Sequence, residues 1–293
     1  MLGKLIKHEF KATYQLFLAI YLIAFASIPF AIFSLSQYEG GAFIGFFKGF
    51  SLFAFIILLI GVNIASTIIC IYRFYTHVLG AESYLTNTLP VKPFHLITSK
   101  ALVSGFWSLC GNIVSIICGY VVLKFSMPHI INEAKTALHE LYKMLSYDTY
   151  FHLENGTKLI TRGSILTTLM VLLTACILSI ILSLVSTPVL YYCSMVVGQY
   201  ISPKHKVVSA IITYFVINFA MNIISSVASS ILIISSSFRT DPYIYADEVL
   251  TLVAMLRTIT YRYMPFALVF SIAVFIGTFF VTNHLLDKRL NLE

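Results

Sequence analysis

The sequence predicts an all-α membrane protein with six transmembrane helices, and three observations carry that prediction. Hydrophobic residues make up 59% of the 293 residues, charged residues only 11%, and the mean hydropathy is +0.90. A soluble domain of this size needs more polar surface than such a composition supplies. The apolar residues also fall in continuous runs of about 20 or more, the length that an α-helix needs to cross a bilayer. Barrel strands would alternate instead.

Six apolar runs define the predicted spans, and together they make 1–293 a single transmembrane domain. Several runs exceed the minimum length, so we expect tilted helices or helices that extend into the interface. The runs occupy approximately residues 15–36, 43–72, 101–125, 164–193, 207–236 and 264–285. Four stretches outside the spans are expected to have roles of their own, namely 1–14, 80–100, 126–163 and 237–263.

The N-terminal segment KLIKHEFKATYQLF predicts an amphipathic helix over residues 1–14 that lies in the membrane interface. Its apolar side chains, including Phe10, turn away from a basic face toward the acyl boundary. An alternative and compatible interpretation is a charged flank that anchors the first span. The basic face carries Lys4, Lys7, His8 and Lys11.

The positions of lysine and arginine favour a topology with both termini in the cytoplasm. A bare count is almost balanced, with ten of the nineteen basic residues on the inner side. The topology follows instead from where the basic residues are concentrated. The short loop 199–206 holds two lysines and no acid, and the tail adds Lys288 and Arg289. Basic residues at the inner edge of the membrane account for the net charge of +7. We therefore expect no nucleic acid as a partner. The expected location is a cell membrane, with the lipid bilayer as the first partner.

Two stretches are expected on the extracellular side. Within 126–163, Ile131, Ala134, Leu138 and Leu141 recur at helical spacing and predict an amphipathic helix. The second stretch, 237–263, combines helical spacing with tyrosines that suit an aromatic belt at the outer interface.

Uncharged polar residues form a stripe on the fifth span. They recur at intervals of four, three and four, which places them on one helical face where they line a path, meet a partner in a dimer or pack within the chain. The stripe consists of Asn218, Asn222, Ser225 and Ser229.

Reactive motifs are missing from the sequence. The eight histidines and five cysteines lack the spacing of metal ligands, so no metal site is expected. There is no G-x-S-x-G elbow and no phosphate-binding loop, because Lys48 in GGAFIGFFKG is not followed by Ser or Thr. We therefore expect no enzymatic activity and no cofactor in this chain.

The polar stretch ESYLTNTLPVKPFHLITSK, residues 82–100, interrupts the apolar runs between the second and third spans. Pro90 disfavours helical geometry at Leu89, and Pro93 suits the first turn of a helix that enters the third span. The expected shape is a short helix, a rigid corner and a second helix. With Tyr84, Leu85 and Phe94 available to a partner, this segment suits docking better than a simple solvated elbow.

The chain resembles the type 2 ABC exporter permeases of bacteria in three features. These are its six spans, the N-terminal stretch LIKHEFKATY, and the segment 82–100 directly before a span. In that family, an E-x-Y-L-x-x-T-L-P-V segment followed by Ser-Lys forms the coupling helix that meets the ATPase subunit. The matching residues are Glu82, Tyr84, Leu85, Thr88, Leu89, Pro90, Val91, Ser99 and Lys100. Directly after the Pro-Val pair, many relatives carry Ser-Arg or Ser-Lys, whereas this chain carries Lys92-Pro93. This departure changes the expected shape of the corner.

The resemblance implies the membrane-spanning subunit of an ATP-driven exporter. It implies a second permease, identical or related, and separate ATPase subunits that carry ATP and Mg²⁺. The mostly apolar spans favour an amphipathic or hydrophobic cargo such as a peptide or a drug. The alternative is a membrane sensor or assembly factor that transports nothing and uses the same segment to dock a cytoplasmic partner.

Overall fold

Six helices in the structure are long and apolar enough to cross a membrane, as the sequence predicts. The computed structural model describes residues 2–36, 42–80, 93–146, 149–153, 156–160, 162–202, 205–237, 256 and 258–289. The six helices are α1 (Leu2–Ser36), α2 (Ala42–Phe74), α4 (Pro93–Ser126), α6 (Arg162–Ile201), α7 (Lys206–Ser237) and α9 (Met264–Arg289). The chain is therefore a multi-pass membrane protein.

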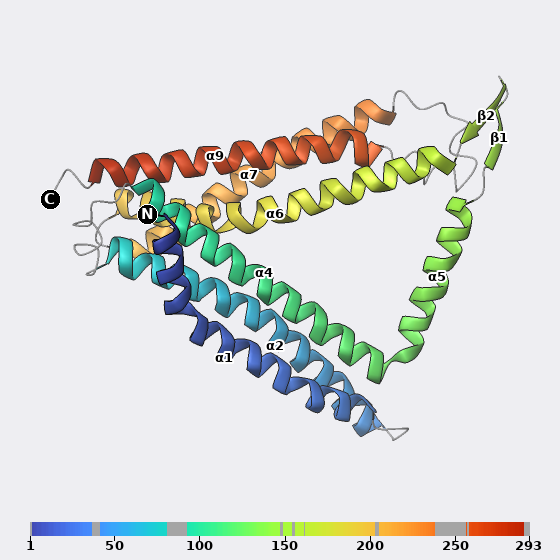
Figure 1. Cartoon of the computed structure of the whole chain (residues 1–293), viewed down its shortest axis with the longest axis horizontal. Helices are drawn as coiled ribbons and strands as arrows, with labels where there is room; N and C mark the ends of the chain where they lie inside the picture. The colour runs from blue at the N-terminus through green and yellow to red at the C-terminus, as the bar shows by residue number, and fades with distance from the viewer. Residues whose placement is uncertain are drawn as a thin grey trace.

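The helices form two groups of three that diverge from one end of the molecule (Figure 1). One group contains α1, α2 and α4, and the other contains α6, α7 and α9. We call the shared end, where α1 begins at Leu2 and α9 ends at Arg289, the joined end. A π-helical turn, η1 (Tyr75–Leu79), continues α2 there, and a second one, η3 (Ile259–Tyr263), precedes α9.

The buried apolar residues form two cores, one within the first helix group and one at the joined end. In the first, Phe17 and Tyr21 of α1 pack with Trp107 of α4 and with apolar side chains of α2. The second core includes Tyr192 of α6 and Leu286 of α9, and it also takes in Phe74 at the end of α2. The second core therefore extends across the joined end and holds the two groups together.

The crossing of α4 and α6 requires a glycine. A Cβ atom added at Gly105 would lie 2.6 Å from the backbone oxygen of Leu184. Real Cβ atoms do not come that close, so any side chain would push the helices apart. Small residues commonly allow such close contacts between membrane helices.

The stretch between α4 and α6 contains a helix and a hairpin. The helix α5 (Pro128–Ser146) confirms the predicted amphipathic element, and it spans the open side of the molecule between the two groups (Figure 1). The strands β1 (Thr149–Leu153) and β2 (Gly156–Ile160) pair antiparallel, with Thr149 opposite Ile160. The predicted all-α fold did not include this short hairpin.

The first span is longer than its apolar run indicates, because α1 is continuous from Leu2 to Ser36. The first turns of α1 run at an angle to the rest of the helix (Figure 1). The Thr13 hydroxyl donates to the backbone oxygen of Glu9 at 2.9 Å, and bonds of this kind often bend helices. The described part of the predicted interfacial segment, residues 2–14, is therefore the bent start of the first helix and continues into the span without interruption.

Candidate functional site

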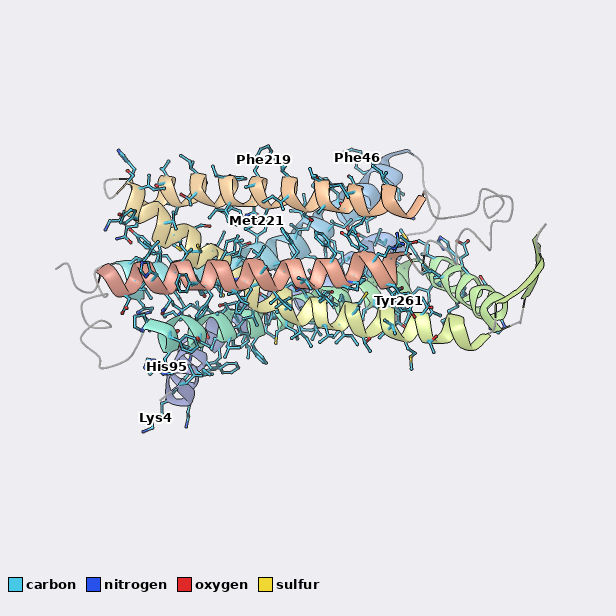
Figure 2. The ribbon with its side chains drawn as sticks, turned by 90° about the horizontal axis from the view of Figure 1, so that it is seen from above. Lys4, Phe46, His95, Phe219, Met221 and Tyr261 are labelled. Atoms are coloured by element: carbon cyan, nitrogen blue, oxygen red, sulfur yellow. The ribbon has the colours of Figure 1, made fainter. Side chains whose placement is uncertain are left out.

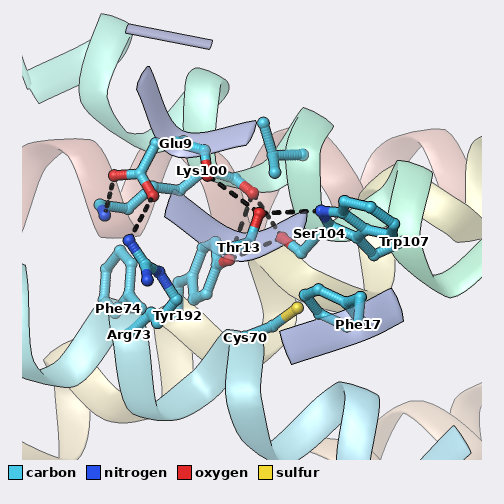
Figure 3. Close-up of a pocket in the computed structure, with 11 residues that line it drawn as sticks. Glu9, Thr13, Phe17, Cys70, Arg73, Phe74, Lys100, Ser104, Trp107 and Tyr192 are labelled. Atoms are coloured by element: carbon cyan, nitrogen blue, oxygen red, sulfur yellow. Dashed lines mark hydrogen bonds and ion pairs between the residues drawn. The ribbon is translucent and has the colours of Figure 1, made fainter. Parts of the chain in front are cut away.

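A partly buried cluster of charges lies at the joined end, where α1, α2 and α4 meet (Figure 3). Lys100 on α4 donates a hydrogen bond to the Glu9 carboxylate on α1 at 2.5 Å. Arg73, near the end of α2, lies 3.6 Å from the second carboxylate oxygen of Glu9. The Lys100 side chain is only 4% exposed. Charged groups are seldom buried unless they are paired, so Glu9 allows Lys100 to leave water, while Arg73 remains partly exposed.

Further contacts fix the orientation of the charged groups. Arg73 also donates to the backbone oxygen of Ala12 at 3.1 Å, so it holds α1 at two points. The Ser104 hydroxyl donates to the backbone oxygen of Lys100. It also bonds with the Tyr192 hydroxyl of α6 at 2.7 Å. The charge cluster of α1, α2 and α4 is thereby connected to the second helix group.

Aromatic rings surround the cluster. Trp107 stacks on Phe17 with a centroid distance of 4.6 Å. Its indole nitrogen donates to the Thr13 hydroxyl at 2.9 Å. On the other side, the Phe74 ring stacks on Tyr192 at 3.9 Å. Burial by these rings removes water from the ion pairs and strengthens them.

The cluster joins both helices that border segment 81–92. Arg73 lies two residues before η1, which leads into that segment, and Lys100 lies two turns into α4, which follows it. Both cations bind Glu9 of α1. A displacement of segment 81–92 that moves either bordering helix therefore acts directly on α1.

No family model matches this chain, and comparison with curated proteins and with solved structures finds no similar protein.

Most of the predicted docking segment lies outside the described residues. This holds for Glu82, Tyr84, Leu85, Thr88, Leu89, Pro90 and Val91. Pro93 is the first residue of α4, which confirms its predicted place in the first turn of a helix. The Phe94 ring meets Phe279 of α9 edge-on at 5.2 Å and remains half-exposed. Phe94 therefore packs partly within the chain.

The predicted interfacial residues separate into two groups. Lys7 and Lys11 are exposed, and Lys4 projects away from the bundle (Figure 2). Phe10 instead stacks on Trp107 of α4 at 4.9 Å. This ring thus contributes to the contact between α1 and α4.

The polar stripe of α7 makes local hydrogen bonds. The Asn218 and Asn222 amides donate to backbone oxygens one turn earlier, at 3.1 and 2.8 Å, and Ser229 does the same toward Ser226 at 2.9 Å. Asn222 is exposed, whereas Asn218, Ser225 and Ser229 are partly buried. The structure does not bring the stripe together with the charge cluster.

The sequence interpretation missed Glu9 and Arg73 as site residues. One available signal was that Glu9 is the single acid within a strongly basic N-terminal segment. Another was that Arg73 and Lys100 each stand beside an apolar run. Among the described residues, no group of His, Cys, Asp and Glu could hold a metal ion.

Proposed function

We propose that this chain is the transmembrane permease subunit of an ATP-driven ABC exporter in a bacterial plasma membrane. One observation carries the proposal: Glu9 binds cations on both helices that border segment 81–92. An ATPase docked on that segment would move the ends of α2 and α4. The ion pairs would pass the movement to α1, and the bond between Ser104 and Tyr192 would pass it to α6.

The ATP chemistry belongs to a partner in this proposal. ATP and Mg²⁺ bind to separate ATPase subunits, since the sequence contains no phosphate-binding loop. Segment 82–94 supplies the docking contacts, with Pro90 and Pro93 at its corner. A rigid corner matters because force passes only through an element that does not bend.

The joined end faces the cytoplasm in this proposal, with both termini on that side. The basic residues concentrated at this end favour such a topology. The bent start of α1 lies along the interface, where exposed Lys7 and Lys11 meet anionic headgroups. The stretches 126–163 and 237–263 then lie outside the cell.

A second permease pairs with this one along α7 in the proposed assembly. Figure 2 shows Phe219 of α7 pointing away from the bundle and Met221 pointing back toward it. The exposed amide of Asn222 and the half-exposed stripe beside it lie on this outlying helix. A polar face is more stable against a partner than against lipid tails. The cargo would be amphipathic or hydrophobic, such as a peptide or a drug.

The proposal is tested by affinity purification of the tagged chain from its native membrane. We expect a copurified protein with a G-x-x-x-x-G-K-[ST] loop. Leu85→Ala should weaken its binding about ten- to hundredfold, as expected for an interface anchor worth roughly 1–3 kcal/mol. The control is Phe46→Ala, an exposed ring on α2 far from the joined end (Figure 2). A copurified signalling protein without an ATPase would favour the sensor alternative.

A further inference from the structure

A cavity at the joined end suits a membrane lipid. It has a volume of about 310 Å³ and lies between the end of α2, the last turns of α6 and the start of α7. This volume is within the usual range of small-molecule sites, roughly 300–1,000 Å³. The cavity is separate from the charge cluster, and none of the residues lining it belongs to that cluster.

The walls of this cavity are almost entirely apolar. They include Leu79, Met195 and Ile211, together with the rings of Tyr191 and Tyr214, which lie 5.1 Å apart. Several α7 residues in the lining, among them Ile211, are half-exposed or more. The cavity is therefore open on the α7 side, where the lipid tails of the surrounding leaflet lie.

The charge at the cavity is positive. Among the described residues that line it, Lys206 is the single charged side chain. Lys206 is also the first residue of α7, so the positive end of the helix dipole lies at the same place. A lysine at a helix end keeps its ammonium group at the headgroup level while its stem follows the apolar wall.

The wall formed by α6 and α7 is tightly packed. A Cβ atom added at Gly198 would lie 2.6 Å from the backbone of Ala210. The Ser209 hydroxyl also donates to the backbone oxygen of Gly198 at 2.7 Å. Such close contact fixes α7 against α6, and a rigid wall lowers the cost of ordering a ligand beside it.

We propose that this cavity binds one anionic phospholipid from the leaflet at the joined end. An acyl chain enters from the α7 side and lies among Met195, Ile211 and Tyr214, and the phosphate pairs with Lys206. A zwitterionic lipid offers the same chain but no net negative charge, so it binds more weakly. This site does not depend on the exporter proposal, because it requires only that the helices lie in a membrane.

The test uses the purified full chain with phosphatidylglycerol and phosphatidylcholine of identical acyl chains. Native mass spectrometry measures how much of each lipid stays bound. We expect retention of phosphatidylglycerol to exceed that of phosphatidylcholine about fivefold, as expected for about 1 kcal/mol per basic residue at an anionic surface. A diazirine in the acyl chain of phosphatidylglycerol should crosslink to α6 and α7 residues of the cavity.

Variants test the contributions of the lysine charge and of the apolar cavity separately. Lys206→Gln should lower retention of phosphatidylglycerol to the level of phosphatidylcholine, and Lys206→Arg should preserve it. Ser194→Leu extends an apolar side chain from a buried position in the lining and should abolish the crosslinks. Lys124→Gln is the matched control, because Lys124 is an exposed lysine at the far end of α4. Equal retention of both lipids, or crosslinks away from the cavity, would overturn the proposal.

Discussion

Glu9 and Lys100 form an ion pair of 2.5 Å between side chains that lie 91 positions apart in the chain. This pair and the neighbouring Arg73 fasten the start of the first helix to both helices that border segment 81–92. The contact thus joins parts of the chain that the order of the sequence separates.

The first prediction concerns removal of the Glu9 charge. Glu9→Gln leaves the Lys100 ammonium buried without its counter-ion, which typically costs about 3–5 kcal/mol of stability. Adding Lys100→Met removes the stranded charge, so the double variant should recover part of the loss. Thermal unfolding of the purified chain in detergent measures both effects.

Glu133→Gln provides the control for that substitution. Glu133 is an exposed residue of α5, so its loss should leave the unfolding midpoint almost unchanged. If Glu9→Gln and Glu133→Gln unfold at the same temperature, the ion pair does not stabilise the fold.

The second prediction concerns the helix crossing. Gly105→Ala places a Cβ against the backbone oxygen of Leu184 and should destabilise the chain by about 1–3 kcal/mol, as overpacking does. Gly119→Ala on the same helix meets nothing within 4 Å. It should be neutral or slightly stabilising, because alanine is the better helix former. Matching midpoints for the two variants would show that the crossing tolerates a side chain.

The third prediction concerns the hydroxyl of Tyr192. Tyr192→Phe retains the stack on Phe74 but removes the bond with Ser104. We expect a loss of about 1 kcal/mol, the usual value for one buried hydrogen bond. Tyr200→Phe, at a highly exposed position of the same helix, is the control and should unfold like the unaltered chain. A Tyr192→Phe variant as stable as that control would contradict the proposed role of the bond.

The sequence predicts the spanning helices well, because long apolar runs report directly on lipid contact. The helix that contains the first span begins about a dozen residues before the predicted apolar run, since Lys4, Lys7 and Lys11 interrupt the hydropathy without breaking the helix. The short hairpin of β1 and β2 escaped prediction because five-residue strands carry little periodicity. The ends of helices at polar residues and short strands are therefore the features that the sequence predicts least well.

The site was predicted only in part. Local features, such as Pro93 at the start of α4, follow from the chain's own stereochemistry. The cluster of Glu9, Arg73 and Lys100 depends on packing between three helices, which no local pattern specifies. Charges beside apolar runs indicate that pairing is needed, but they do not identify the partners.

The fourth prediction concerns the corner of the docking segment. In the proposed assembly, Pro90→Gly should preserve binding of the ATPase, because the apolar side chains of Leu85 and Leu89 remain. It should weaken the ATP turnover that the assembled permease induces, since glycine lets the corner bend. Turnover of the purified complex, compared with that of the free ATPase, measures this effect. Full turnover in the Pro90→Gly complex would show that rigidity at this corner is unimportant.

Direct contact between segment 82–94 and an ATPase is the central claim, and site-specific photocrosslinking tests it most directly. A benzoylphenylalanine replaces Tyr84 in the tagged chain, and in a second sample it replaces Phe46, which lies far from the joined end (Figure 2). Irradiation of native membranes should join position 84, and not position 46, to a protein with an ATP-binding loop. The absence of an ATPase adduct at position 84, or equal adducts at both positions, would contradict the account.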